Sequence, residues 1–218
     1  MLSTGIRIGL GEAIPDTKGL PMKLALALLA CLCLALPALA DTNQVVITEI
    51  MYNTIGNDVE FFELYNPSTT EAVDLTGWWV IDDDLEHDPV ALAGSIGPEG
   101  VLVVAGTLAL FTVQYPFVTN YNPNDYEAYW ALGNGGDMAR VYNAANELVD
   151  EVAFDDALPW PLAADGTGPS LELYLSYLYD NNQAAAWATG FDWGTPGEYP
   201  AAPVATGENN LSAIKALY

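Results

Sequence analysis

The chain has 218 residues, of which 29 are acidic and only 5 are lysine or arginine, so its formal net charge at pH 7 is −24. A surface with this charge repels phosphate backbones and anionic lipid, which argues against nucleic acid as a partner. The length is sufficient for one domain with a sizeable hydrophobic core.

The amino-terminal 40 residues predict export. Residues 1–21 are rich in glycine and fit no signal sequence, so we interpret them as a non-native extension upstream of the true start. Residues 22–40 have the order of a secretory signal peptide: Lys23, an apolar run, and small residues that end at Ala40. The run is short for a bilayer and Pro37 interrupts it, so we expect cleavage after Ala40 and no transmembrane segment in the mature chain.

Both cysteines, Cys31 and Cys33, lie inside the predicted signal peptide. The mature chain would therefore form no disulfides, and its stability would rest on its hydrophobic core. Residues 28–31 also resemble a bacterial lipobox, which would make Cys31 a lipidated amino terminus. Secretion and lipid anchoring at the cell surface both remain open at this point.

Beyond the signal peptide, the pattern is one of short strands separated by turn residues. Runs of β-branched and aromatic residues predict strands at residues 45–52, 60–65, 72–75, 78–81, 101–105, 138–142, 148–154 and 170–175. Leu108, Phe111 and Tyr115 recur at helical spacing and predict one short helix over residues 108–115. The region from Asp180 onward is turn-rich, and no strand is expected there. This spacing indicates an all-β sandwich or barrel.

Alternation within the strands assigns side chains to faces. Phe62 and Leu64 are expected on one face of their strand, with Phe61, Glu63 and Tyr65 on the opposite face. Trp78 and Trp79 are adjacent, so only one of them can fill the centre of the sandwich.

Seven segments resemble, in the same order, those of bacterial lamin-tail domains: residues 45–53, 60–68, 73–78, 132–137, 149–152, 168–173 and 194–197. The resemblance implies an immunoglobulin-like β-sandwich, which we expect over residues 41–200. It further implies a non-enzymatic binding or structural module of an exported protein, with a protein or cell-surface ligand as its partner. Some nuclear members of the family contact DNA, a role that the charge of this chain opposes.

Two segments fall outside the simplest pattern. The aromatic stretch 108–130 is interpreted as a loop that packs over the sandwich, with a contact surface as the alternative. Residues 201–218 are expected to form a flexible tail, and the apolar end at 211–218 could serve as a sorting tag.

The densest acidic run predicts a calcium site. Asp82, Asp84, Glu86 and Asp88 alternate along an extended loop and could direct their carboxylates to one side, where oxygen ligands suit calcium. The loop is not an EF-hand, because His87 stands where that motif needs glycine. A calcium-dependent adhesion or carbohydrate-binding domain is therefore the first alternative function, and no other cofactor is expected.

No pattern of residues indicates catalysis. His87 is the single histidine, the mature chain has no cysteine nucleophile, and no G-x-S-x-G elbow is present. No pair of acids is distinguished from the rest as a glycosidase pair would be. We expect the protein not to be an enzyme, with a hydrolase that uses an unrecognised carboxylate pair as the second alternative.

Overall fold

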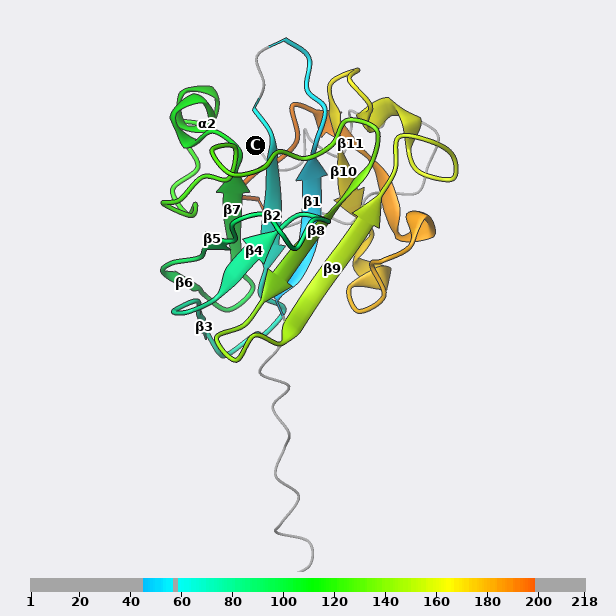
Figure 1. Ribbon diagram of the computed structural model, residues 1–218. Helices are drawn as coiled ribbons and strands as arrows, with labels where there is room; N and C mark the ends of the chain where they lie inside the picture. Colours follow the sequence, from blue (N-terminus) through cyan, green and yellow to red (C-terminus); the bar gives the residue numbers. More distant parts are fainter. Residues whose placement is uncertain (1–44, 57–58, 199–218) are drawn as a thin grey trace, which may run out of the picture. The chain divides into compact units, whose positions relative to one another are not determined.

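The computed structural model describes residues 45–56 and 59–198 (Figure 1). Contacts divide the chain into two units, Met1–Asp41 and Thr42–Tyr218, and every described residue belongs to the second. The predictions for the upstream extension, the signal peptide, the lipobox and the tail at 201–218 lie outside the described residues. Within those residues, no helix has the length and apolar character needed to cross a membrane.

The described chain is built mainly of antiparallel strands. A five-stranded sheet has the order β11-β10-β1-β2-β7 and consists of β1 (Val46–Met51), β2 (Phe61–Tyr65), β7 (Val101–Ala105), β10 (Pro169–Leu173) and β11 (Trp187–Asp192). A four-stranded sheet has the order β5-β4-β8-β9 and consists of β4 (Trp79–Ile81), β5 (Val90–Ala91), β8 (Asp137–Tyr142) and β9 (Leu148–Phe154). A two-stranded ladder pairs β3 (Val73–Asp74) with β6 (Ser95–Ile96). The helical elements are α2 (Leu108–Gln114), η1 (Leu162–Ala164), η2 (Leu175–Tyr177) and η3 (Ala184–Ala186).

The two larger sheets pack face to face, which confirms the predicted all-β sandwich (Figure 1). The main core includes Ile47, Ile50, Phe62 and Leu64 from the five-stranded sheet and Val80, Val141, Val152 and Phe154 from the four-stranded sheet. Trp78 enters this core, whereas Trp79 stacks outside it on Tyr142 with ring centroids 4.0 Å apart. The expectation that only one tryptophan fills the centre is thus confirmed.

A second, smaller core lies on the other face of the five-stranded sheet. Because side chains alternate along a strand, Phe61 points away from the face that carries Phe62. Helix α2 covers this outer face, with its buried Phe111 against the Phe61 ring. The cluster consists of Met51, Val59, Phe61, Val103, Ala105, Phe111, Tyr115 and Val118. Strand β7 is therefore buried along its whole length.

The aromatic stretch 108–130 packs over the sandwich, in agreement with the favoured interpretation. Phe111 and Tyr115 belong to the outer core, while Tyr126 and Trp130 reach the main core, stacked with ring centroids 4.4 Å apart. Phe117 and Tyr129 are the exceptions in this stretch, with 65% and 54% of their surfaces exposed.

The expectation of no strand beyond residue 175 was wrong. Strand β11 pairs with β10, with Leu173 opposite Trp187 and Leu171 opposite Thr189. Gly190 interrupts its β pattern, yet the structure needs glycine there, because a Cβ would lie 2.5 Å from the Ser170 hydroxyl. Strands β5 and β6 were also missed, since two residues are too few for alternation to show.

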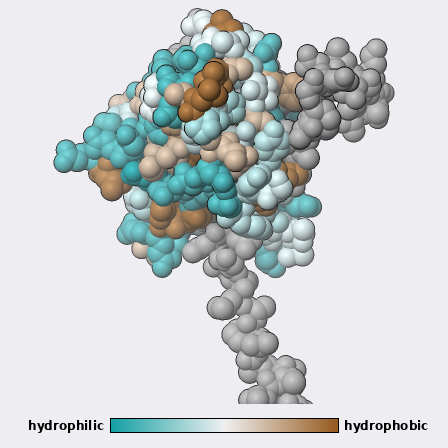
Figure 2. Space-filling view, turned by 90° about the vertical axis from the view of Figure 1, so that its right-hand side faces the viewer, coloured by the Kyte–Doolittle hydropathy of each residue, from teal (hydrophilic) through white to brown (hydrophobic). Residues whose placement is uncertain are grey.

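The surface offers no broad apolar face on the side shown in Figure 2, where hydrophobic side chains form separate patches among hydrophilic ones. Scattered exposed hydrophobic residues are ordinary in monomeric proteins. On this side, the polar and acidic side chains are therefore the groups to consider as sites.

Candidate functional site

The acidic run after β4 does not gather its carboxylates as the alternation predicted. Asp82 is buried, whereas Asp84, Glu86 and Asp88 are exposed. Two successive side-chain turns shape the loop: Asp82 Oδ1 accepts the Asp84 N–H at 3.3 Å, and Asp84 Oδ1 accepts the Glu86 N–H at 2.9 Å. Of the four predicted ligands, only Asp82 belongs to a cluster of carboxylates that could share an ion.

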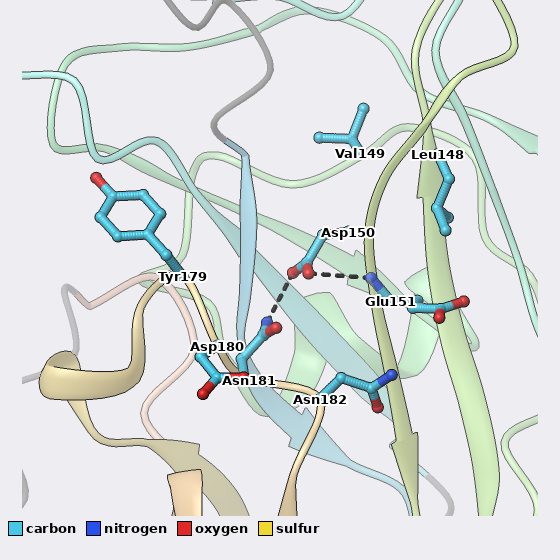
Figure 3. Close-up of a pocket in the computed structure, with 8 residues that line it drawn as sticks. All are labelled: Leu148, Val149, Asp150, Glu151, Tyr179, Asp180, Asn181 and Asn182. Carbon is cyan, nitrogen blue, oxygen red and sulfur yellow. Dashed lines mark hydrogen bonds between the residues drawn. The ribbon is translucent and has the colours of Figure 1, made fainter.

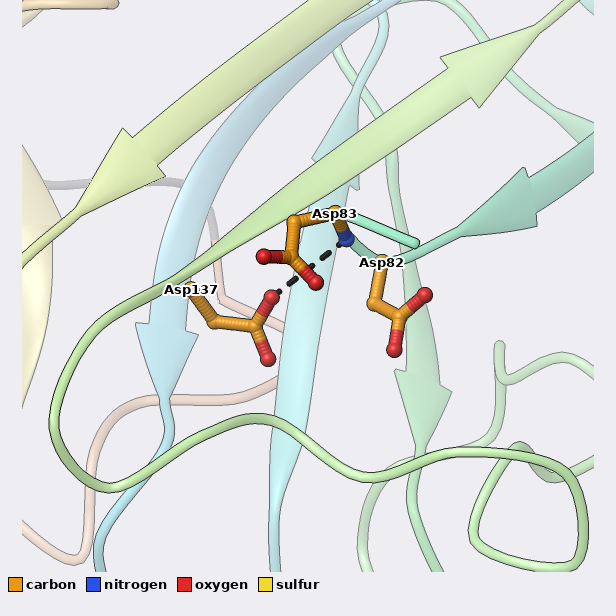
Figure 4. A group of neighbouring side chains, drawn as sticks. All are labelled: Asp82, Asp83 and Asp137. Carbon is orange, nitrogen blue, oxygen red and sulfur yellow. Dashed lines mark hydrogen bonds between the residues drawn. The ribbon is translucent and has the colours of Figure 1, made fainter. Parts of the chain in front are cut away.

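That cluster brings together Asp82, Asp83 and Asp137 (Figure 4). Ile81 at the end of β4 pairs with Arg140 of β8, so the residues after β4 emerge beside the first residue of β8. One carboxylate oxygen from each aspartate lies within 4.8 Å of the other two. This is the candidate metal centre of the described chain.

Backbone donors hold Asp137 in place. Its Oδ2 accepts the Gly133 N–H at 2.6 Å, and its Oδ1 accepts the N–H groups of Met138 at 2.7 Å and Asp83 at 3.4 Å. Burial raises the pKa of Asp137, the bonds from Gly133 and Met138 lower it, and the neighbouring Asp83 and Asp82 raise it further. A cation would relieve this crowding of carboxylates, and hard oxygen ligands of this kind suit calcium.

Two basic side chains already border the cluster. His87 Nδ1 lies 2.8 Å from Asp82 Oδ2, and its hydrogen bond with Asp82 raises the pKa of the imidazole. Arg140 donates to the backbone carbonyl of Asp83 at 3.2 Å. A calcium ion at this centre would compete with a protonated His87 for Asp82.

Three further carboxylates lie side by side on the outer face of the five-stranded sheet. Glu49 of β1 is directly opposite Glu63 of β2 on one side and Glu172 of β10 on the other. We call these three residues the glutamate row. Their exposed fractions are 3%, 1% and 7%, so this is a buried arrangement of like charges. Like charges directly opposite one another destabilise a sheet unless something neutralises them.

The glutamate row is bonded to the turn that follows β11. Glu49 Oε1 accepts the Thr195 N–H at 2.8 Å, and Glu63 Oε2 accepts the Gly197 N–H at 2.7 Å. Glu172 Oε1 accepts the Thr195 hydroxyl at 3.3 Å. The turn therefore covers the glutamate row and is held to it by these three hydrogen bonds.

Burial is the largest influence on the row's titration. It raises the pKa of Glu49 to about 8, against lowering bonds from Ser170 and Thr195. Burial also raises the pKa of Glu63 well above its ordinary value, and the neighbouring Glu49 adds to this effect. The pKa of Glu172 is raised by burial as well. Neighbouring acids with raised pKa values are a feature of glycosidase sites. Here, however, the turn after β11 covers them.

A shallow depression of about 280 Å³ lies between β9 and the loop that precedes η3 (Figure 3). Its lining residues are Leu148, Val149, Asp150, Glu151, Tyr179, Asp180, Asn181 and Asn182. Asp150 Oδ2 accepts the Ile47 N–H at 2.6 Å and the Asn181 amide at 2.8 Å, and burial raises its pKa to about 6. These bonds join the loop to β1 and β9, so Asp150 has a structural role in the floor of the depression.

An antiparallel sandwich of this kind belongs to the immunoglobulin-like class, which serves structure and binding in many proteins. The family model of the Lamin Tail Domain matches residues 39–156, and the chain therefore belongs to that family. The resemblance noted in the sequence and the fold that it implied are both confirmed. No curated protein and no solved structure matches the chain. Strands β10 and β11 and the turn over the glutamate row lie beyond the matched residues.

Proposed function

We propose that the protein is a non-catalytic binding or structural module that acts outside the cell. The observation that carries the proposal is the Lamin Tail Domain, an immunoglobulin-like structural domain, together with residues 22–40, which have the features of a secretory signal. The net charge of −24 favours a protein or cell-surface ligand over nucleic acid.

Fractionation of cells that express the full chain tests this proposal. The protein is expected in the medium or on intact cells, with Asp41 as its first residue by amino-terminal sequencing. Surface crosslinking and mass spectrometry are then expected to recover a recurrent partner with the folded protein and not with a heat-unfolded control. Retention inside the cell with residues 22–40 intact would contradict export, and turnover of a substrate would contradict a non-catalytic role.

A calcium-dependent adhesion or carbohydrate-binding domain is the second candidate. The observation in its favour is the convergence of Asp82, Asp83 and Asp137, in which Asp137 joins the acidic run from a separate strand. Asp84, Glu86 and Asp88 lie outside this group of three carboxylates, so they would contribute to the field around the ion more than to its coordination.

Thermal unfolding with calcium and with a chelator tests the second candidate. An ion that binds only the folded state raises the free energy of unfolding by mass action, by about 2.7 kcal/mol when the ion is at a hundredfold excess over its Kd. The midpoint of thermal unfolding rises accordingly. The Asp137→Asn variant is expected to lose this shift, while the matched Asp88→Asn variant keeps it. An unshifted wild type, or an equal shift in both variants, would rule out the centre at Asp82, Asp83 and Asp137.

A further inference from the structure

We propose that residues 193–198 form a strap that closes over the outer face of the five-stranded sheet only while the glutamate row holds protons, so that alkaline conditions open the strap and uncover an apolar surface. The proposal goes beyond the binding or structural role and depends neither on export nor on calcium.

Polar bonds to a few distant residues fix the strap. Its central amides, Thr195 N–H and Gly197 N–H, donate to Glu49 and Glu63 at 2.8 Å and 2.7 Å. At its start, the carbonyl of Trp193 accepts the Tyr115 hydroxyl at 2.5 Å. The Thr195 hydroxyl also donates to Glu172 at 3.3 Å, and the Trp193 N–H donates to the Gly168 carbonyl at 2.8 Å. Three of these five attachments therefore use carboxylates whose charge depends on pH.

The strap also covers part of the outer core. A Cβ at Gly194 would lie 2.9 Å from the Phe61 ring, and one at Gly197 would lie 3.1 Å from Val118. Both glycines have positive φ, +68° and +85°, which a residue with a side chain adopts only with strain. The backbone of the strap thus lies directly on Phe61 and Val118, and its departure would expose both to water.

No described cation neutralises the row. The titratable groups that face Glu49 are Glu63 from β2, Glu172 from β10, Glu198 from the strap and Tyr115 from the segment after α2. Across residues 45–56 and 59–198, the single lysine or arginine is Arg140 of β8, which bonds to Asp83 and Met138. Protons must therefore balance the row, because adjacent anions in a buried site repel strongly.

The direction of the pH effect follows from the raised pKa of Glu49. In the closed form its pKa is about 8, and an opened, hydrated row would return it toward its ordinary value of 4.5. The open form therefore binds fewer protons between these values, and rising pH favours it. For one such group, the open population grows about tenfold per pH unit between about pH 4.5 and 8 and levels off above. Glu63 and Glu172, whose pKa values are also raised, make the dependence steeper.

Amide hydrogen exchange of the full chain, measured by NMR in chelator between pH 5 and 9.5, tests the proposal. After correction for intrinsic exchange, protection of the Thr195 and Gly197 amides is expected to fall at least about tenfold per pH unit up to about pH 8. Protection of the Leu102 and Val104 amides in β7 is expected to stay constant over the same range.

Variants that cannot ionise distinguish titration of the glutamate row from a general loss of protection at high pH. Glu49→Gln keeps an acceptor for Thr195 but cannot ionise, so it is expected to reduce the slope by about one decade per pH unit. Glu172→Gln is a second test and is expected to reduce the slope by a smaller amount. Glu71→Gln removes an exposed charge, and this control variant should retain the wild-type slope. Constant wild-type protection of Thr195 and Gly197 up to pH 9.5, or an unchanged slope in Glu49→Gln, would overturn the proposal.

Discussion

Replacement of Phe111 by alanine tests whether the outer face of the five-stranded sheet is a true second core. Phe111 is fully buried and is the residue through which α2 is anchored to the sheet. Its ring centroid lies 5.8 Å from that of Phe61 and 4.9 Å from that of Tyr115. The substitution would remove all of these contacts while leaving the main core intact.

The expected loss is about 3 kcal/mol in the free energy of unfolding. Truncation of a buried phenylalanine costs roughly 3–5 kcal/mol, and each aromatic pair adds up to about 1.5 kcal/mol beyond its buried area. We expect the lower end, because α2 has only seven residues and lies at the surface, where it can settle into part of the space. Even this loss is a large share of a total stability of about 5–15 kcal/mol.

Urea unfolding followed by circular dichroism measures the loss, with Val113→Ala as the matched control. Val113 lies in the same helix but is 80% exposed, so its truncation should change the stability by no more than about 0.5 kcal/mol. A loss below about 1 kcal/mol for Phe111→Ala, or equal losses in the two variants, would show that the outer cluster contributes no core energy.

Two further predictions concern the acidic side chains and the turn that positions one of them. Gly136 has φ +105°, and a Cβ there would lie 2.9 Å from the Phe154 carbonyl, so Gly136→Ala should cost about 2 kcal/mol or more in chemical denaturation. Gly135→Ala meets no atom within 4 Å and should be nearly neutral; equal costs would refute the argument. The pKa of Asp150 is raised from 3.8 to about 6, so its contribution is complete below about pH 4 and is lost as the pH rises through 6, by about 3 kcal/mol. Urea midpoints between pH 4 and 7 should show this loss in the wild type relative to Asp150→Asn, and parallel curves would contradict it.

Local pattern was enough to predict an all-β sandwich or barrel, because side-chain alternation is a property of each strand alone, and the resemblance to lamin-tail domains indicated the sandwich. Alternation separated Phe62 and Phe61 onto opposite faces of β2, and it limited the centre to one of Trp78 and Trp79. It failed at the two-residue strands β5 and β6, and in β11, where Gly190 breaks the pattern to make room for Ser170.

The cluster of Asp82, Asp83 and Asp137 shows a different limit of prediction from sequence. Sequence proximity suggested Asp84, Glu86 and Asp88 as partners of Asp82, but the turns of the loop leave these three exposed. The partner that the fold supplies is Asp137, at the start of the strand that pairs with β4. Strand pairing joins residues far apart in the chain, and a local acidic pattern carries no information about it.

By itself, the sequence determined the family, the all-β class, the faces of the main strands and the acidic character of the protein. Only the tertiary structure decided that Glu49 and Glu63 are buried, since alternation places them opposite the main core, where solvent would be expected. Their cover comes from a distant segment: Thr195, which donates to Glu49, lies 146 residues further along the chain. Burial of a charge depends on everything that packs around it, and this is why the glutamate row emerged only from the fold.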